Sequence, residues 1–435
     1  MKIFSKILLK LSLIVLTVGM IFLFPSNFTA VELEYETAHG NPMKGFVPYY
    51  SEEGMSSSVP YSMEWFYVPL GELVKQDGTY QIREGMEPYL CNIAKRGHQA
   101  VFRVYLDYPE KDSGVPDFIW DMGVKKYTYS ENGGGVSPDY SDQRLINILC
   151  EFIKKLAEEY DGDGRIAYIT TGLLGHWGEW HVSEEISECM ASEKQQEQLI
   201  EAYTDSFKKT KILTRYPGTA GTQDGNIGFH DDSFTYSTLG TKSHYFYNRL
   251  LKNGQTGIWK AQAIGGEFRP ENQKPFLSGE TMERYQSYER CVKATHCSWL
   301  INHGAFYDLT EAQIEKAKEA SAELGYDFYI SRAWVKQGKE KSTVYVTVKN
   351  TGVAPIYAAP DVFIGTDSNE IKCEQRISEL MPGRSIIFTA ELSVKSGDGI
   401  HIRFGSLYDG CAPIRFSNKG ATDSEDGAFI LGTVK

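Results

Sequence analysis

The segment IAYITTGLLGHWGEWH, residues 166–181, decides the fold. It begins as a short run rich in Ile, Tyr and Thr, which favours a β-strand, and it ends in glycines followed by polar and aromatic residues. The stretches 143–160 and 193–209 on either side have the apolar periodicity of amphipathic helices. The segment is therefore a strand between two helices, as in an α/β protein.

The same unit recurs between Asn41 and about Gly325, with further helical stretches at 84–95, 278–293 and 310–324. Eight apolar runs are expected to be strands: residues 43–49, 63–69, 100–108, 166–174, 212–216, 227–234, 257–264 and 298–302. Eight strand-helix units predict a (β/α)8 TIM barrel over residues 41–325. An open doubly wound sheet is the alternative, but no glycine-rich phosphate loop follows an early strand, which favours the barrel.

The pattern changes after Tyr326. Alternating runs at 342–348, 362–365, 385–392 and 400–404 are separated by turn residues, with no helical stretch between them. The segment VTVKNTGVAPIY, residues 346–357, is typical of a strand, a turn and a second strand. We expect residues 326–435 to form a small immunoglobulin-like β-sandwich, which either supports the barrel or binds a ligand.

The first thirty residues are expected to be a signal peptide or an N-terminal anchor. Lys2, Lys6 and Lys10 precede an apolar stretch at 11–24, which is the order of a secretory signal. The bulky Phe28 lies where cleavage after Ala30 would favour a small residue, so a segment that stays attached and anchors the protein to a membrane is the alternative. The protein is therefore expected to be secreted or extracellular.

Composition and charge exclude several classes of protein. The 435 residues are 41% hydrophobic and 13% aromatic with a formal net charge of −12, which fits a folded acidic protein and argues against a nucleic-acid partner. The seven cysteines are widely scattered; Cys373 and Cys411 are a candidate disulfide, with free buried thiols as the alternative. No CxxC or HExxH motif occurs, so neither a structural metal nor a cofactor is predicted.

Two glutamates follow predicted strands, where a barrel places its reacting groups. Glu179 lies between Trp177 and Trp180, and apolar surroundings raise the pKa of a carboxyl group toward that of a general acid. Glu267 follows two glycines and precedes Arg269, which could hold a nucleophilic carboxylate ionised. A protonated and an ionised carboxyl group are what glycosidic cleavage requires; a separation of about 5 to 5.5 Å gives retention and about 6.5 to 9.5 Å gives inversion.

Other side chains at the predicted strand ends are candidates for sugar binding. Hydrogen-bonding and stacking groups of this kind also serve structural roles, and for the run His230, Asp231 and Asp232 a metal site is the alternative to hydroxyl binding. No GxSxG motif occurs, which argues against a serine nucleophile. The expected substrate-binding residues are Tyr49, Arg103, Asp107, His176, Trp177, Trp180, His181, Arg215, His230, Asp231, Arg269, Asn302 and His303.

Several motifs resemble the secreted proteins grouped as domain of unknown function 4832 with its N-terminal companion 4874. The resemblance extends from Asn41 to the C-terminus and implies a glycosidase-like barrel with a β-sandwich tail, in a family whose activity is largely undefined. The motifs are NPMKGFVPYY (41–50), FRVYLDYP (102–109), VSPDYSD (136–142), GLLGHWGEWH (172–181), NIGFHDDSFTYSTL (226–239), IGGEFRPE (264–271) and THCSWLINHG (295–304).

The arrangement is also similar to the large clan of retaining glycoside hydrolases. That resemblance implies Glu179 as the acid/base and Glu267 as the nucleophile, although Gly178 stands where the clan usually has Asn. The sequence thus predicts an exported glycoside hydrolase, with a carbohydrate substrate and no cofactor, acting on an extracellular or cell-surface polysaccharide. The alternative is a non-catalytic glycan-binding or polysaccharide-assembly protein with the same barrel.

Overall fold

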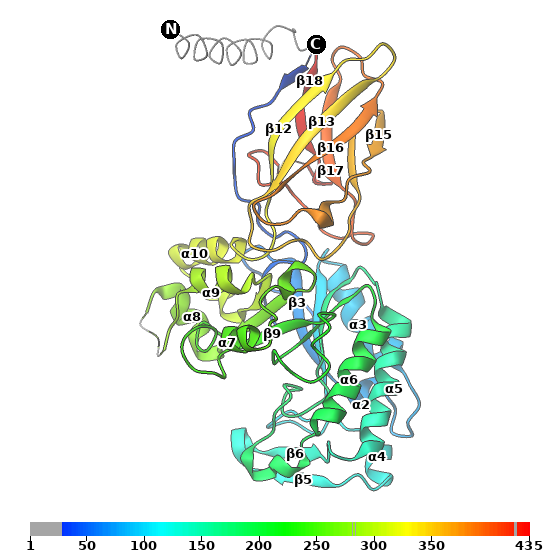
Figure 1. Ribbon diagram of the computed structural model, residues 1–435, viewed down its shortest axis with the longest axis vertical. Coiled ribbons are helices and arrows are strands. Elements are labelled where there is room, and N and C mark those ends of the chain that lie inside the picture. Colours follow the sequence, from blue (N-terminus) through cyan, green and yellow to red (C-terminus); the bar gives the residue numbers. More distant parts are fainter. Residues whose placement is uncertain (1–27, 281, 283, 422–423) are drawn as a thin grey trace, which may run out of the picture.

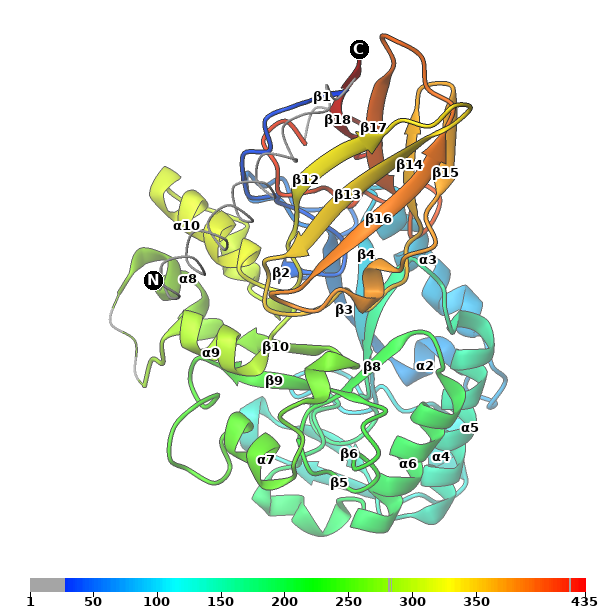
Figure 2. The ribbon, with the colours of Figure 1, turned by 45° about the horizontal axis from the view of Figure 1, so that its top comes forward.

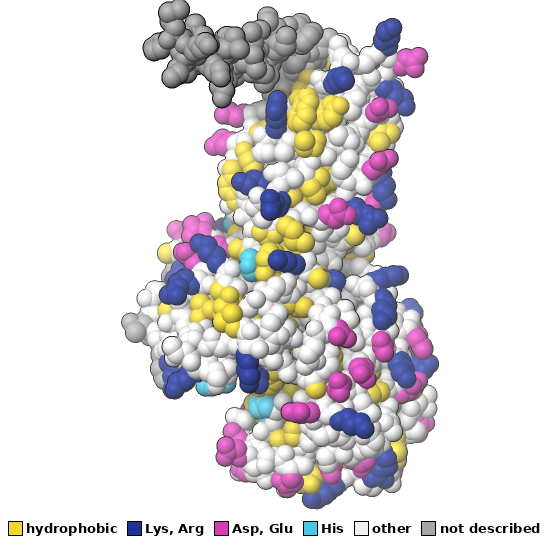
Figure 3. Space-filling model, viewed as in Figure 1, with side chains coloured by type: hydrophobic (Ala, Val, Ile, Leu, Met, Phe, Trp, Pro, Cys, Tyr) yellow, Lys and Arg dark blue, Asp and Glu magenta, His cyan; other side chains and the backbone are white. Residues whose placement is uncertain are grey.

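The structure is a computed structural model that describes residues 28–435 apart from 281, 283, 422 and 423. It has two stacked parts, an α/β barrel and a pair of antiparallel sheets (Figure 1). Lysine, arginine, aspartate and glutamate side chains are intermixed over both parts on the face that Figure 3 shows. Across the described residues, no helix is long and apolar enough to cross a membrane.

The barrel is an eight-stranded parallel sheet with the order β2-β11-β10-β9-β8-β7-β4-β3. Its two ends meet beyond β2, where the Tyr50 amide donates to the Trp65 carbonyl (2.7 Å) and the Trp65 amide to the Pro48 carbonyl (2.9 Å). The sheet is thus nearly closed, and the predicted α/β barrel is confirmed. The strands are β2 (Gly45–Val47), β3 (Met63–Pro69), β4 (Gln99–Tyr105), β7 (Ile166–Thr170), β8 (Lys211–Thr214), β9 (Gly228–Phe234), β10 (Ile264–Phe268) and β11 (Trp299–Ile301).

The prediction was wrong for one barrel strand. Residues 258–260 form a short 3-10 helix, and β10 begins only at Ile264, so Glu267 lies inside the strand. Gly265 and Gly266 resemble a turn in the sequence, but both are buried strand residues. A Cβ on Gly265 would lie 2.2 Å from the Trp299 ring, and one on Gly266 would lie 2.6 Å from the Asp231 carbonyl, so neighbours occupy the space of a side chain.

Helices surround the barrel, and capping residues fix where several of them begin. The Asp142 side chain accepts from the Arg144 amide at the start of α5, and Thr310 forms a capping box with Gln313 at α10. The helix expected over 278–293 is instead divided, because Gly279 in the left-handed conformation ends α8. The helices are α2 (Leu70–Leu73), α3 (Ile82–Ala94), α4 (Asp117–Asp121), α5 (Gln143–Tyr160), α6 (Glu193–Ser206), α7 (Phe246–Lys252), α8 (Pro270–Ser278), α9 (Tyr288–Thr295) and α10 (Glu311–Ala322).

Aromatic rings fill the barrel below its C-terminal mouth. Trp65 and Trp299 stack with ring centroids 5.9 Å apart, and Tyr168 stacks on Trp299 at 5.7 Å. All three side chains are fully buried. The interior is therefore a packed core, and a ligand is limited to the end of the barrel above these rings.

The C-terminal part contains two antiparallel sheets, as predicted, with the orders β1-β18-β17-β14-β15 and β12-β13-β16. Their inward faces share one apolar core. An immunoglobulin-like strand arrangement stays a prediction. The strands are β1 (Phe28–Ala30), β12 (Phe328–Lys336), β13 (Ser342–Asn350), β14 (Val362–Thr366), β15 (Asn369–Lys372), β16 (Ser385–Leu392), β17 (Gly399–Phe404) and β18 (Phe429–Val434).

These sheets pack on the end of the barrel where its strands begin (Figure 2). The Tyr408 hydroxyl donates to the His98 carbonyl and the Tyr357 hydroxyl to the Trp259 carbonyl, both at 2.6 Å. His98 and Trp259 precede β4 and β10. The opposite end of the barrel, where the strands finish, is left for the site.

The N-terminal strand and the cysteines bear on two of the predictions. Phe28–Ala30, at the end of the expected signal segment, forms β1, which pairs with β18, and the Phe28 side chain is buried. The signal segment itself stays a prediction. The rest of the expected signal segment, residues 1–27, lies outside the described residues. Cys373 and Cys411 do not pair, and all seven cysteines are free thiols.

Smaller elements complete the described chain. A hairpin of β5 (Lys126–Tyr129) and β6 (Gly135–Pro138) follows β4 and lies at the far end of the barrel from the sandwich (Figure 1). The short 3-10 helices are η1 (Glu131–Gly133), η2 (Glu184–Cys189), η3 (Ile258–Lys260), η4 (His303–Ala305) and η5 (Ile377–Glu379).

Candidate active site

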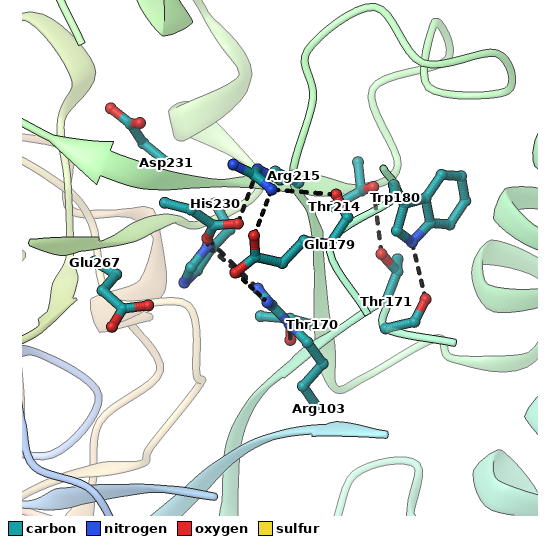
Figure 4. A network of polar contacts seen from close by, with 12 residues as sticks. Arg103, Thr170, Thr171, Glu179, Trp180, Thr214, Arg215, His230, Asp231 and Glu267 are labelled. Atoms are coloured by element: carbon teal, nitrogen blue, oxygen red, sulfur yellow. Dashed lines mark hydrogen bonds and ion pairs between the residues drawn. The ribbon is translucent and has the colours of Figure 1, made fainter. Parts of the chain in front are cut away.

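Charged side chains from four strand ends and one loop converge at the C-terminal mouth of the barrel (Figure 4). Arg103 lies in β4, Arg215 directly follows β8, Asp232 lies in β9 and Glu267 in β10. Glu179 comes from the loop that follows β7. The parallel topology thus brings together residues that are far apart in the sequence.

The loop of residues 172–181 has an unusual backbone. Leu173, Trp177 and Trp180 have φ values of 67°, 53° and 62°, in the left-handed region that non-glycine residues rarely adopt. Hydrogen bonds from the Trp177 amide to the Asp107 carbonyl and from the Trp180 amide to the Leu174 carbonyl, both 2.9 Å, hold this conformation. Such strain costs on the order of 1–3 kcal/mol per residue and is concentrated at functional sites. Here it turns Glu179 back toward the barrel.

Gly178 allows the loop to approach β4 closely. A Cβ at this position would lie 2.9 Å from the Gly172 Cα and 3.2 Å from the Arg103 Cδ, and Gly178 has a φ of 70°. An asparagine would have to displace backbone atoms. Gly178, where the retaining clan usually has Asn, therefore has a physical cause: the Arg103 side chain packs directly against the loop at this residue.

Two arginines hold Glu179. Arg103 Nη1 donates to Oε1 at 3.3 Å, and Arg215 Nη1 donates to Oε2. The Arg103 side chain is 2% exposed and its guanidinium lies over the Trp65 ring, 5.2 Å from the centroid. Thr170 accepts from Arg103 Nε at 2.9 Å, which fixes the direction of the guanidinium. Both oxygens of Glu179 are thus engaged by cations.

Asp232 balances the second positive charge. Its Oδ2 lies 2.9 Å from Arg215 Nε, its Oδ1 lies 3.5 Å from Arg103 Nη2, and Oδ1 also contacts His230 Nδ1. Burial opposes ionisation of Asp232, but His230 and the two arginines outweigh it and hold its pKa well below the usual range. Arg103, Arg215, Glu179 and Asp232 form a charge-balanced cluster, which we call the arginine cluster.

Glu179 has a raised pKa within this cluster. Burial raises the pKa to about 7, with Arg215 and Arg103 acting in the opposite direction and Asp232 adding to the rise. His181 lies next to it, and Arg215 Nη1 donates to His181 Nδ1 at 2.9 Å. Burial and the Arg215 charge lower the pKa of His181 to about 4, so this imidazole is neutral at pH 7.

Glu267 occupies a different environment on the other side of the mouth. It is 7% exposed, and the Tyr49 hydroxyl donates to its Oε1 at 2.8 Å. Among the described residues, no lysine, arginine or histidine forms an ion pair with it. Burial raises the pKa of Glu267 to about 8, and the charges of Asp232 and Glu179 raise it further than burial alone. A protonated carboxyl group is favoured here at neutral pH.

Arg269 does not serve Glu267, contrary to the prediction. Its Nε pairs with the Glu271 side chain at 2.7 Å, and its guanidinium lies over the Tyr236 ring at 4.2 Å. Arg269 lies one residue beyond β10, where it caps the start of α8, and the chain has left the strand at this point. The adjacent basic residue in the sequence is thus not the partner in space.

Asp107 and His176 lie in a buried network that supports the loop. Asp107 accepts from Tyr129 Oη at 2.8 Å and from Ser137 Oγ, and it lies 2.8 Å from His176 Nδ1. The Ser183 amide donates to His176 Nε2 at 2.9 Å. Both side chains are 1% exposed, so their polar atoms are already occupied within the protein. They position the loop that carries Glu179.

Asp231 points away from the mouth, contrary to the prediction. Thr238 Oγ1 donates to its Oδ2 at 2.6 Å, on the outer side of β9 (Figure 4). Burial raises the pKa of this carboxyl group to about 6. Successive residues of a strand point to opposite sides, so His230 and Asp232 point to the inner side of β9 and Asp231 points to the outer side. His230 itself is fully buried and stacks 5.7 Å from Trp65, below the charged groups.

The two tryptophans of the loop have different surroundings. Trp180 is buried in the apolar core and its Nε1 donates to the Gly172 carbonyl at 2.9 Å, so it does not face a ligand. Trp177 is half-buried, with its ring 6.4 Å from Tyr108 in an edge-on arrangement. Trp177 is the one of the two that keeps a ring available for stacking.

Asn302 and His303 follow β11 beside Tyr49. His303 Nδ1 accepts from the Tyr49 amide at 3.3 Å. Asn302 is fully buried, and neither its Oδ1 nor its Nδ2 has a partner among the described residues. Two orphan groups of this kind are costly unless water or a ligand satisfies them.

Sequence reasoning did not assign Thr170 and Tyr67. Thr170 ends β7 and orients Arg103, and the Tyr67 ring lies 5.8 Å from the Arg103 guanidinium. Both belong to regular strands without any motif around them. The sequence indicates them only through their positions in the strands, because alternate residues of a barrel strand point toward the interior. Among the described residues, no group of His, Cys, Asp and Glu is arranged to hold a metal ion.

Comparison with known proteins gives structural similarities only. No family model matches the chain, and no curated protein sequence matches it. An α-amylase from Geobacillus thermoleovorans complexed with acarbose is 11% identical, with a TM-score of 0.34, over 77% of this chain and 89% of that one. The catalytic domain of a β-amylase from Paenibacillus polymyxa is 11% identical, with a TM-score of 0.40, over 60% and 90%. Xylanase 10B from Thermotoga maritima is 11% identical, with a TM-score of 0.33, over 60% and 70%. These likenesses are distant, and the strand order and register given above define the fold.

Proposed function

We propose that this chain is an exported glycoside hydrolase that cleaves glycosidic bonds in an extracellular or cell-surface polysaccharide with retention of configuration. We place it among the secreted proteins with domains of unknown function 4832 and 4874, as its motifs imply. One observation carries the proposal: two buried carboxyl groups, Glu179 and Glu267, reach one barrel mouth from environments of opposite character.

This pairing supports acid-base chemistry on a glycosidic bond. Glycoside hydrolysis needs one carboxyl group that gives a proton and one that is anionic. The arginine cluster surrounds Glu179 with cations, whereas Glu267 contacts a neutral hydroxyl. Groups whose environments separate their pKa values are the usual acid and base of such sites.

The lining of the mouth supports a carbohydrate substrate. Tyr49, Tyr108 and Trp177 are half-buried rings near the two glutamates, and such rings stack on the apolar faces of sugars.

The test is a screen of the purified protein against a panel of polysaccharides, with analysis of the released sugars. We expect Glu179→Gln and Glu267→Gln each to lower turnover of the best substrate at least about 100-fold, as expected for loss of a reacting group. Glu271→Gln is the matched control, since this exposed glutamate lies four residues from Glu267 and pairs only with Arg269. Wild-type turnover in both glutamine variants would refute the proposal.

A second candidate function is glycan binding without turnover. The observation that favours it is the engagement of both Glu179 oxygens by arginines, since an ion-pair network of this kind also serves a purely structural role. Binding of an oligosaccharide from the panel, measured by calorimetry, together with no released product over a long incubation, would favour this function over hydrolysis.

A further inference from the structure

We propose that Glu267 is the general acid of this site and that Glu179 is the carboxylate nucleophile, the reverse of the roles that the retaining clan implies. This assignment rests on the proposed function. The argument compares what each carboxyl group contacts.

Glu179 is placed to remain an anion. Its two oxygens accept from two different guanidinium groups, those of Arg103 and Arg215. A proton on Glu179 would remove the anionic charge that pairs with both guanidinium groups, and breaking a buried ion pair costs about 3–5 kcal/mol. Arg103 is 2% exposed, so water cannot easily replace the lost contact. The two ion pairs thus oppose the effect of burial on Glu179, whereas Glu267 has no such partner, so Glu179 is the more readily ionised of the two carboxyl groups.

Glu267 is placed to carry a proton. Tyr49 Oη donates to Oε1, and Oε2 makes no hydrogen bond to any described residue. Burial raises the pKa of Tyr49 well above its usual range, so this phenol stays a neutral donor. A buried carboxyl group without a cation partner favours its neutral form. Oε2 is therefore the oxygen that would hold the proton and present it.

The groups around Glu267 add to this preference. Neutral tyrosines come from the segments after β2 and β4 and from β3, and the anions Asp232 and Glu179 come from β9 and from the loop after β7. Arg103 of β4 is a cation that lowers its pKa, and that guanidinium is already shared by Glu179 and Asp232. The titratable and charged groups facing Glu267 are Tyr49, Tyr67, Arg103, Tyr108, Glu179 and Asp232.

The reaction would proceed in two balanced steps. In the first, Glu267 gives its proton to the glycosidic oxygen, the electron pair of the C1–O bond goes to that oxygen, and a Glu179 oxygen bonds to C1. In the second, the Glu267 carboxylate takes a proton from water, the water oxygen bonds to C1, and the Glu179–C1 bond breaks with its electron pair returning to Glu179. One water is consumed, and both carboxyl groups regain their starting forms.

Leaving-group dependence tests the assignment. The probes are the 2,4-dinitrophenyl and methyl glycosides of glucose, galactose, mannose and xylose, because a dinitrophenolate leaves without a proton whereas methoxide needs one. We expect the bond-cleavage step of Glu267→Gln to fall by less than about tenfold on the cleaved dinitrophenyl glycoside and by more than about 100-fold on the methyl glycoside. Glu179→Gln should lose more than about 100-fold on both.

Azide provides a second readout that a merely structural role would not move. Azide added to Glu267→Ala should yield a glycosyl azide of retained configuration, because Glu179 still forms the covalent intermediate. Azide added to Glu179→Ala should yield the inverted azide by direct attack on C1. Thermal unfolding of each variant checks that it is folded.

The opposite results overturn the assignment. If Glu179→Gln shows the leaving-group dependence and Glu267→Gln loses both substrates, Glu179 is the acid and the proposed function stands. If both variants turn over both glycosides like wild type, the proposed function itself fails and the assignment fails with it.

Discussion

The two sides of the barrel mouth differ in how they treat a buried carboxyl group. On the side built by β4, β7, β8 and β9, Glu179 and Asp232 meet the buried Arg103 and the partly exposed Arg215, and each charge has a partner. On the side built by β2, β10 and β11, Glu267 meets the hydroxyl of Tyr49 and no cation among the described residues. The comparison teaches that the same side chain can be an anion or an acid within one cavity, because its neighbours decide.

The support behind each side differs as well. The Glu179 loop is strained, and Asp107 and His176 fix it from below through a fully partnered network. Glu267 lies in β10, where the register against β9 shifts, with glycines on its N-terminal side that leave room for Trp299. The environment of Glu179 is thus set by specific hydrogen bonds and ion pairs, whereas that of Glu267 is set mainly by burial. The following changes break or sharpen this contrast.

The largest expected effect is on folding when a cation is removed from the arginine cluster. Arg103→Met leaves Glu179 and Asp232 short of one buried partner and should lower the free energy of unfolding by about 3–5 kcal/mol. Arg144→Met is the control, since this side chain is 51% exposed and an exposed pair contributes at most about 1 kcal/mol. Urea unfolding measures both. A cost below about 1 kcal/mol for Arg103→Met would show that the cluster is not a stabilising unit.

The two glutamates should respond to neutralisation by different amounts. The folded pKa of Glu267, about 8, exceeds the ordinary value of 4.5, so the folded state holds the proton more tightly. Its contribution to stability is complete below the ordinary value and is lost as pH rises toward 8, at up to about 1.4 kcal/mol per pH unit. Glu267→Gln removes this loss and should be more stable than wild type at pH 8 but not at pH 4.

The folded pKa of Glu179, about 7, is raised as well, but Arg103 and Arg215 oppose the rise, so Glu179→Gln should gain less stability relative to wild type at pH 8 than Glu267→Gln does. Urea unfolding of the two variants and wild type at pH 4, 6 and 8 makes the comparison. Equal pH profiles for the two variants would mean that the two sides of the mouth do not differ as described.

A smaller effect is expected where the loop touches β4. Gly178→Asn introduces the residue of the retaining clan, but its Cβ would lie 2.9 Å from the Gly172 Cα, and we expect a loss of about 1–3 kcal/mol and lower turnover. Gly279→Asn is the matched control: it has the same φ of 70°, and its Cβ meets only Lys316 Nζ at 4.0 Å. Asparagine tolerates this conformation well, so thermal unfolding should change little there. Increased turnover in Gly178→Asn would contradict the packing argument.

The smallest effect is expected at the ring beside the anionic side. Trp177→Ala should raise KM several-fold with kcat nearly unchanged, because loss of one stacking ring weakens binding by about 1 kcal/mol. Trp177→Phe keeps an aromatic face and should lie close to wild type. Steady-state kinetics on the substrate found in the panel measures both. An unchanged KM in Trp177→Ala would place the sugar elsewhere in the mouth.

Periodicity in the sequence predicted the barrel well where strands are apolar. The strand 63–69 and the helix Gln143–Tyr160 have the predicted bounds. Their buried positions produce a regular spacing of apolar residues in the sequence, which predicts the element directly. The strand predicted at 257–264 ends before Glu267, whereas β10 runs from Ile264 to Phe268 and includes two glycines packed beside Trp299 and the Asp231 carbonyl. Close packing between segments that are far apart in the sequence produces no such pattern and could not be predicted.

The site was predictable in part. The convergence of Glu179 and Glu267 on one mouth follows from the topology of a barrel once their strands are known. Their partners could not be predicted, since Arg269 is next to Glu267 in sequence but pairs with Glu271, while Arg103 and Arg215 reach Glu179 from other strands. Strand alternation could have distinguished Asp232 from Asp231.

The most direct test of the central claim is a titration of the two carboxyl groups in the folded protein. Carbon-13 NMR of protein labelled at the glutamate carboxyl carbon follows each group, and the signals missing from Glu179→Gln and Glu267→Gln assign them. We predict that Glu267 titrates near pH 8, above Glu179 near pH 7. A Glu267 that titrates below Glu179, or near the ordinary pKa of a glutamate, would contradict the account.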